Sequence, residues 1–298
     1  LGVAFKRGGS IMALDYMTSI MTGPLLSAVS FLIGVVKKLF FEVDNVTNAF
    51  ERATSLGDEY SVSLQQNYED LRALGITIED VSRQTQVMIS AVTDFTLQSQ
   101  SAQREITQIG ARLERVGVSM EDFAQGAQNS MKMFGMGMIE AGQFASELTE
   151  TARELGVAPQ KMASDFARVG GSLAKLGRDG PRAFKELARV SKITGLEIEK
   201  LINLTSKFDT FEDAATMTGQ LNAALGGNFV NAMDMMMTTD PVARFEQLRD
   251  AISSTGLTFD EMSYYQRQFF ANAMGLDSVG DLALLMSGNM DMLGGAVN

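Results

Sequence analysis

A turn built around a glycine recurs along the chain and limits what it can fold into. In each copy an apolar residue follows the glycine and capping residues come next, as in Leu74–Asp80 and Val116–Asp122. Glycine adopts the left-handed conformation that ends a helix, and the apolar residue packs back on the last helical turn. The turn glycines predicted in this way are Gly75, Gly117, Gly156, Gly195, Gly256 and Gly275. The chain is therefore predicted to be a series of helices joined by tight turns.

The residues after these glycines are of the kinds that begin helices. The predicted N-caps are Thr77, Ser119, Thr258 and Asp277, the partners in capping boxes are Asp80, Asp122 and Glu261, and Pro159 suits a first helical position. Carboxylates at these positions also lie at the positive end of the helix dipole. We therefore interpret the paired acidic residues as structural, not as a catalytic acid and base.

The apolar residues between the first turns are spaced by four and then three positions. One run covers residues 39–71 and a second covers residues 81–116, and this 3.5-residue period is typical of a coiled-coil seam. In the second run the seam residues are Met88, Val92, Phe95, Ala102, Ile106, Ile109, Leu113 and Val116. The first four turn glycines lie 42, 39 and 39 residues apart. Each interval is predicted to hold one long helix, paired in an antiparallel hairpin or with other copies of the chain.

Glycine becomes more frequent after Gly156, which predicts shorter helices in the second half. Methionines gather at 131–138 and at 233–237, the first group beside Gly135, Gly137 and Gly142. We interpret them as ordinary packing, with a close helix contact or hinge at these glycines, or a refolding or membrane-active element, as alternatives. No segment has the alternating pattern of a strand. The predicted fold class is all-α, with long coiled-coil-type helices followed by a bundle of shorter helices and little or no β-sheet. The predicted domains are an apolar N-terminal segment, 1–41, long helical hairpins, 42–156, and a compact bundle, 157–298.

The most apolar stretch runs from Pro24 to Val36 and is closed by Lys37 and Lys38. Its thirteen residues are too few to span a bilayer as a helix, and extension back towards residue 11 includes Asp15. Two interpretations stay open: a buried or oligomer-contacting helix, or a segment that enters a membrane at a later stage. The side chains concerned are Pro24, Leu25, Leu26, Val29, Phe31, Leu32, Ile33, Val35 and Val36. The first residue, Leu1, and the glycine-rich end are read as those of a fragment.

The composition excludes most enzyme classes. The 298 residues include no cysteine, histidine or tryptophan, which removes thiol nucleophiles, imidazole-based triads and the usual zinc ligands. No glycine loop is followed by the lysine of a phosphate-binding loop. The 36 acidic and 25 basic residues give a net charge of −11, so tight nucleic-acid binding is not expected. We expect no enzyme activity, no cofactor and no metal.

Four segments of the second half resemble tape measure proteins of tailed-phage virions. They are Phe208–Ala215, Gln220–Gly227, Met236–Pro241 and Met262–Arg267, within a region of resemblance that covers about residues 150–290. The resemblance implies a non-enzymatic, mostly helical protein that lies as a homo-oligomer in the lumen of the tail tube or at the tail tip. It implies contacts with tail-tube and baseplate or tail-tip proteins, a role in setting tail length, and passage to the host membrane when the genome is ejected.

Other functions remain open from sequence. The apolar N-terminal region is also typical of a membrane-perforating helical toxin or effector, and the heptads are typical of a signalling coiled coil. The glycine-broken second half argues against the signalling protein. Hydrolysis that uses only carboxylates is the remaining enzymatic alternative, and no motif points to it.

Overall fold

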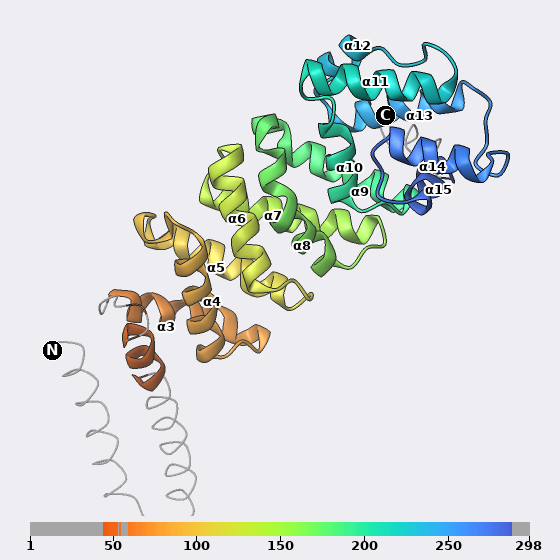
Figure 1. Ribbon diagram of the computed structural model, residues 1–298. Coiled ribbons are helices and arrows are strands. Elements are labelled where there is room, and N and C mark those ends of the chain that lie inside the picture. Colours follow the sequence, from red (N-terminus) through yellow and green to blue (C-terminus); the bar gives the residue numbers. More distant parts are fainter. Residues whose placement is uncertain (1–43, 53, 55–58, 288–298) are drawn as a thin grey trace, which may run out of the picture. The chain divides into compact units, whose positions relative to one another are not determined.

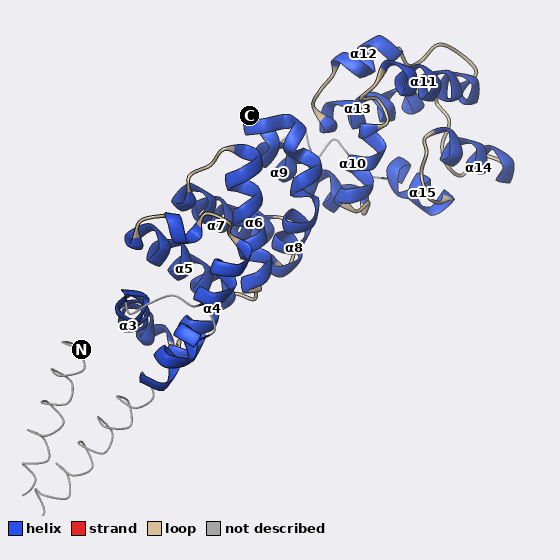
Figure 2. Cartoon of the chain, turned by 60° about the vertical axis from the view of Figure 1, so that its left-hand side comes forward, coloured by secondary structure: helices blue, strands red, loops and turns tan. Residues whose placement is uncertain are grey.

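The computed structural model describes residues 44–52, 54 and 59–287, and the regular structure in these ranges is helical (Figures 1 and 2). No strand occurs within them, which confirms the predicted all-α class. The chain divides into two compact units, residues 1–90 with 96–108, and residues 91–95 with 109–298. The boundary predicted at Gly156 therefore lies inside the second unit. The predicted apolar segment, 1–41, lies outside the described residues.

In the first unit, residues 44–52 and 54 are helical, and α3 (Glu59–Leu71) and the short 3-10 helix η1 (Arg72–Leu74) follow. Helix α4 (Ile78–Ala91) follows, then the 3-10 turn η2 (Phe95–Leu97) and α5 (Gln100–Glu114). Both α4 and α5 have one end in the second unit. Inside the first unit, Gln108 of α5 donates hydrogen bonds to Asn67 (3.2 Å) and Asp70 (2.9 Å) of α3.

The second unit contains the remaining helices. They are α6 (Met120–Phe134), α7 (Met138–Glu154), α8 (Pro159–Val169), the 3-10 segment η3 (Gly170–Asp179), α9 (Gly180–Thr194), α10 (Ile198–Ser206), α11 (Phe211–Leu225), α12 (Ala232–Met237), α13 (Pro241–Ser253), α14 (Tyr264–Ala273) and α15 (Val279–Ser287).

The intervals between turn glycines from Gly75 to Gly195 each hold two short α-helices with a break between them. Helices α6 and α7 fill the interval from Gly117 to Gly156, and α8, η3 and α9 fill the interval from Gly156 to Gly195. Helices α10 and α13 form the next pair, with α11 and α12 inserted between them in sequence (Figure 1). The prediction of one long helix in each interval is therefore wrong for residues 59–287.

Breaks near the middle of each interval explain this difference. Helix α6 ends at Gly135, whose φ of 71° is left-handed, and the N–H of Gly137 donates to Glu140 (3.2 Å) at the start of α7. Between α4 and α5, the side chain of Gln128 in α6 hydrogen-bonds both the N–H (3.1 Å) and the hydroxyl (2.8 Å) of Thr93. The two glycines thus lie in the turn between α6 and α7.

Most of the predicted seam residues are buried or partly buried, but they do not lie along one coiled coil. Val92 and Phe95 are each 1% exposed and lie in the break between α4 and α5, whereas Val116, which is 39% exposed, follows the end of α5. A helix that packs on one side of a core repeats its apolar residues every three or four positions, as a coiled coil does. The 3.5-residue spacing of apolar residues therefore runs through the break between α4 and α5 and gives no sign of it.

The turn glycines have the backbone conformation that the sequence predicts. Their φ angles are 75° at Gly75, 98° at Gly117, 60° at Gly156, 77° at Gly195, 67° at Gly256 and 63° at Gly275. The capping pairs also form, because the hydroxyls of Thr77 and Ser119 accept from the N–H groups of Asp80 (3.2 Å) and Asp122 (3.1 Å).

Two predicted caps are wrong. Ser278, and not Asp277, caps α15, because its hydroxyl accepts from the N–H of Asp281 at 3.1 Å. Thr258 bonds Glu261 (2.8 Å) in a turn, but α14 begins only after Ser263. Ser263 forms a reciprocal capping box with Gln266, which satisfies two backbone donors at once.

Side chains one repeat apart join successive hairpins of the second unit. Gln160 accepts from the N–H of Ser119 (2.7 Å) and donates to Asp122 (2.8 Å), 41 and 38 residues away. Asn129, which is buried, donates to the carbonyl of Ala167 (2.9 Å), again 38 residues away. These separations match the spacing of the turn glycines, so each hairpin stacks on the next in the same register.

Four phenylalanines form the centre of this stack. The ring of Phe166 in α8 lies edge-on to Phe144 of α7 (5.1 Å between centroids) and to Phe184 of α9 (5.0 Å), and at 6.1 Å from Phe134 of α6. All four rings are at most 5% exposed. Edge-to-face pairs add to the stability gained from burial, so Phe166 couples the two hairpins.

We expect the same substitution at two glycines to change stability in opposite directions. A Cβ at Gly180 would lie 2.2 Å from the buried ring of Phe134, so Gly180→Ala should lower the free energy of unfolding by about 1–3 kcal/mol. A Cβ at Gly219, inside α11, meets nothing within 4 Å, so Gly219→Ala should raise it by about 0.5–1 kcal/mol. Urea denaturation of both variants tests the packing, and changes of the same sign would contradict it.

Candidate interaction surface

Segments that carry the resemblance meet around a buried arginine of α13. Arg244 has a side chain that is 5% exposed, and its Nε donates to the carbonyls of Met235 (3.0 Å) and Thr238. Its Nη1 donates to the carbonyl of Thr205 (2.9 Å) and to the carboxylate of Asp209 (2.5 Å). The guanidinium thus neutralises the carbonyl ends of α10 and α12, where a positive charge is stabilising.

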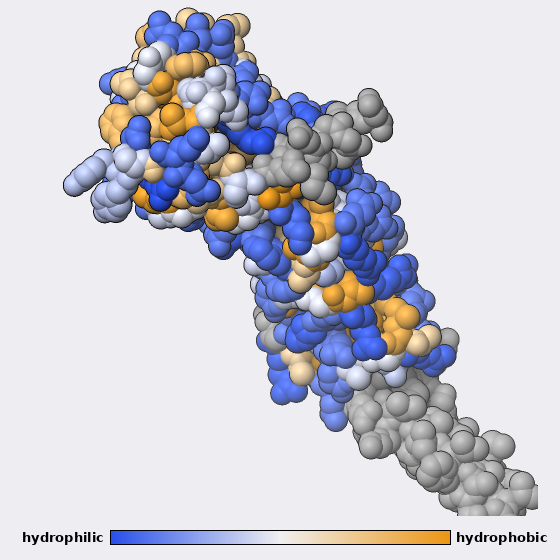
Figure 3. Space-filling view, turned by 90° about the vertical axis from the view of Figure 1, so that its right-hand side faces the viewer, coloured by the Kyte–Doolittle hydropathy of each residue, from blue (hydrophilic) through white to orange (hydrophobic). Residues whose placement is uncertain are grey.

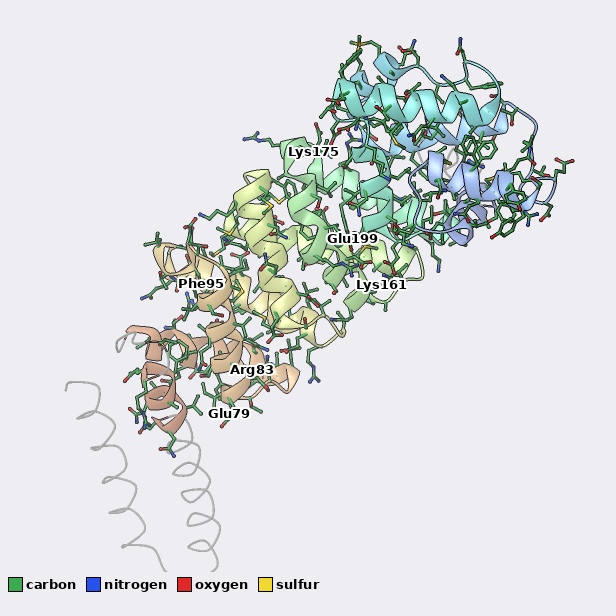
Figure 4. The ribbon with its side chains drawn as sticks, viewed as in Figure 1. Glu79, Arg83, Phe95, Lys161, Lys175 and Glu199 are labelled. Carbon is green, nitrogen blue, oxygen red and sulfur yellow. The ribbon has the colours of Figure 1, made fainter. Side chains whose placement is uncertain are left out.

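Asp209 connects this arginine to η3. Its carboxylate also accepts from Lys175 at 2.5 Å, and Figure 4 shows where Lys175 lies. Burial raises the pKa of Asp209, but the hydrogen bonds from Lys175 and Arg244 lower it by more, so the pKa lies below its usual value. The carboxylate therefore stays ionised and holds η3, α10 and α13 together.

Other residues of the same segments close loops and begin helices. The side-chain oxygen of Asn222 accepts from the N–H groups of Phe229 and Val230, both at 2.9 Å. Thr210 caps α11 and Asp240 caps α13. These contacts give the residues that carry the resemblance a structural role in the C-terminal part of the chain.

Large apolar side chains are exposed on the same part of the molecule. They are Phe211, Phe229, Met233, Met237, Tyr264, Tyr265, Phe269 and Leu284. Tyr264 and Tyr265 are 75% and 82% exposed. Figure 3 shows apolar patches, interspersed with hydrophilic residues, over the part that carries α11 to α15. Large apolar side chains exposed on one part of a protein are typical of sites that bind another molecule.

Helix α11 contributes a stripe without charge to this surface. Phe211, Ala215, Gly219 and Ala223 are four residues apart and all exposed, and no charged residue occurs in the twenty positions 214–233. Helix α11 packs on both α12 and α14. We call the exposed residues Phe211, Ala215, Gly219, Ala223, Tyr264, Tyr265 and Phe269 the α11–α14 surface.

Two open grooves lie beside turn glycines. One of about 600 Å³ runs along α15 beside Gly256, and one of about 470 Å³ lies between Gly156 and Gly195. In the second groove Lys161 bonds Asp165 (2.9 Å) and Lys192 bonds the carbonyl of Gly156 (3.3 Å). Both cations are thus held by groups of the protein itself.

A cluster of charges ties α8 to α10 next to this groove. Asp165 is buried and accepts from Lys161 (2.9 Å) and Arg168 (2.7 Å), and Arg168 also lies 3.5 Å from Glu199 of α10. Figure 4 labels Lys161 and Glu199 in their helices. Because all four groups are paired, the arrangement stabilises the stack.

The structure leaves some predicted features outside its described ranges. The apolar residues from Pro24 to Val36 lie there, and among the described residues no helix combines the length and apolarity needed to cross a bilayer. Within the same residues no three acidic side chains come together as a metal site would require.

Comparison with protein-family models, curated proteins and solved structures gives no match for this chain.

Replacement of Arg244 should strongly destabilise the second unit. Arg244→Ala leaves Asp209, whose side chain is 36% exposed, with Lys175 as its remaining cation, and leaves several helix-end carbonyls without a donor. It should lower the free energy of unfolding by about 2–4 kcal/mol. Arg178→Ala, at an exposed position, is the control and should change it by less than about 0.5 kcal/mol. Equal effects of the two variants in denaturant titrations would contradict the role assigned to Arg244.

A second ionic contact makes stability depend on pH. Lys200 of α10 bonds both oxygens of Asp281 in α15 (2.9 and 3.0 Å), and Ser278 donates to the same carboxylate (2.9 Å). Burial raises the pKa of Asp281, but these hydrogen bonds lower it by more, so the pKa lies below its usual value. The pKa of Asp281 is lower in the folded protein than in the unfolded chain, where it is about 4. Such a carboxyl stabilises the fold at pH values above the unfolded pKa, and this stabilisation is lost as the pH falls through the folded pKa.

Asp281→Asn should therefore be destabilising by about 1–3 kcal/mol at neutral pH. The difference between the wild-type protein and this variant should shrink between about pH 5 and pH 3, as the wild-type carboxylate takes up its proton. Unfolding free energies measured across that range check the expectation. A difference that stays constant with pH would show that the Lys200 contact contributes no ionic stabilisation.

Proposed function

We propose that this chain is a non-enzymatic structural protein of a tailed-phage virion. In this proposal it acts as a tape measure in the lumen of the tail tube, sets tail length together with other copies, and assists passage of the genome through the host envelope. Support comes from the resemblance in the second half and from a fold of stacked helical hairpins. Stacked repeats contact mainly their neighbours, which suits a protein that lines an extended assembly.

The observation that carries this proposal is the α11–α14 surface. The segments that resemble tape measure proteins include an uncharged stripe and three exposed aromatic side chains. Such side chains are typical of the centres of protein–protein interfaces. The net charge of −11 is also compatible with a DNA path, because like charge opposes adhesion of DNA to the protein.

A membrane-perforating helical protein is the second candidate function. It is favoured by the apolar stretch from Pro24 to Val36, which the cations Lys37 and Lys38 follow. In that case the isolated chain would release dye from liposomes without any other virion protein.

Mass spectrometry of purified phage particles, before and after genome ejection, tests the proposed function. We expect peptides of this chain in full particles and their loss after ejection. Absence of the peptides from virions would contradict the tape measure proposal, and dye release by the isolated chain would then favour the membrane-perforating protein.

A further inference from the structure

A glycine in the middle of α11 has no explanation within the described part of the chain. Glycine inside a helix is less favourable than alanine by about 1 kcal/mol. A Cβ at Gly219 would meet nothing within 4 Å. No contact among the described residues therefore requires a residue without a side chain at this position. Gly219 lies between Ala215 and Ala223 on one exposed stripe. Small residues on a helix allow a second element to approach its backbone closely, so the stripe suits a partner.

The α14 side of the surface has the composition of an interface core. The rings of Tyr264 and Tyr265 meet edge-on at 5.4 Å, and Phe269 lies one helical turn after Tyr265. The single charged residue of α14, Arg267, lies 4.5 Å from the ring of Phe259 and donates to the carbonyl of that residue (3.0 Å). Its charge is thus held by a neighbouring loop, and the aromatic face is left without a fixed charge.

The charge around this surface selects the kind of partner. Residues 208–287 contain eleven acidic and three basic residues. Two such surfaces brought face to face would place like charges together, which opposes binding. The complementary partner therefore has an apolar centre with basic flanks.

The N-terminal segment of this same chain has that chemistry. Residues 1–41 contain four basic residues and one acidic residue, and Lys37 and Lys38 directly follow the apolar run from Pro24 to Val36. Leucine, valine, isoleucine and phenylalanine dominate the run, and they match the aromatic and small side chains of the α11–α14 surface in polarity.

We propose that the α11–α14 surface of one copy binds the apolar segment Pro24–Lys38 of a second copy. The contact joins two different surfaces, so it is heterologous and continues from copy to copy. The choice of a second copy rests on the proposed function, in which several copies lie together. Binding also covers the apolar segment until the copies separate, so the same contact shields the segment that would meet a membrane.

Site-directed disulfide cross-linking tests the contact, because the natural chain contains no cysteine. One full-length chain carries Ser27→Cys in the apolar segment, and a second, with a tag that changes its size, carries Ala223→Cys on α11. Mixed and mildly oxidised, the two should give a disulfide-linked heterodimer. The control replaces the second chain by one with Gln143→Cys, an exposed position on α7. The heterodimer should be several-fold more abundant with Ala223→Cys than with the control.

Charge reversal provides the second arm of the experiment. Lys37→Glu with Lys38→Glu, added to the Ser27→Cys chain, should lower the heterodimer yield several-fold, and added salt should lower the yield of the parent pair. Equal cross-linking of Ala223→Cys and Gln143→Cys, or no effect of the reversal, would overturn the proposal. A negative cross-linking result does not change what is expected from mass spectrometry of virions, and absence from virions does not change the expected cross-link. The two experiments therefore distinguish failure of this contact from failure of the proposed function.

Discussion

The stacking of one hairpin on the next depends on a left-handed glycine at the end of each pair of helices. Gly117, Gly156 and Gly195 reverse the chain at nearly equal intervals, so the first helix of each pair returns to the same place in the stack. That register lets Gln160 bond Ser119 and lets Phe166 meet the rings of two hairpins. A residue with a Cβ is strained at positive φ, so the turn positions constrain all later contacts.

Local features were predictable from the sequence because they depend on neighbouring residues alone. The turn glycines, the Ser119–Asp122 cap and the start of α8 at Pro159 are of this kind. The breaks inside each interval were not predicted, because a helix facing a globular core and a coiled coil share their apolar spacing. Gly135 and Gly137 were the available signal for the break between α6 and α7, because glycine commonly ends a helix.

The candidate surface depends on contacts that sequence spacing cannot supply. Arg244 bonds Asp209, which lies 35 residues earlier in the chain. That α11 and α12 are inserted between α10 and α13 can be recognised only when α10 and α13 are seen to pack as a pair. The uncharged run 214–233 can be seen in the sequence. Its packing alone decides which of its residues face the core and which face the solvent. Gly219 has space around it, and this can be seen only in the structure. The sequence alone could not single it out as a candidate contact residue.

A distance measurement between spin labels tests the hairpin account most directly. Cysteines introduced at Glu121, near the start of α6, and at Glu154, at the end of α7, would be the only thiols in the chain. Antiparallel helices packed about 8–10 Å apart place these labels within about 25 Å of each other. One continuous helix, which rises 1.5 Å per residue, would hold them about 50 Å apart. The account predicts the short distance, and the long distance would contradict it.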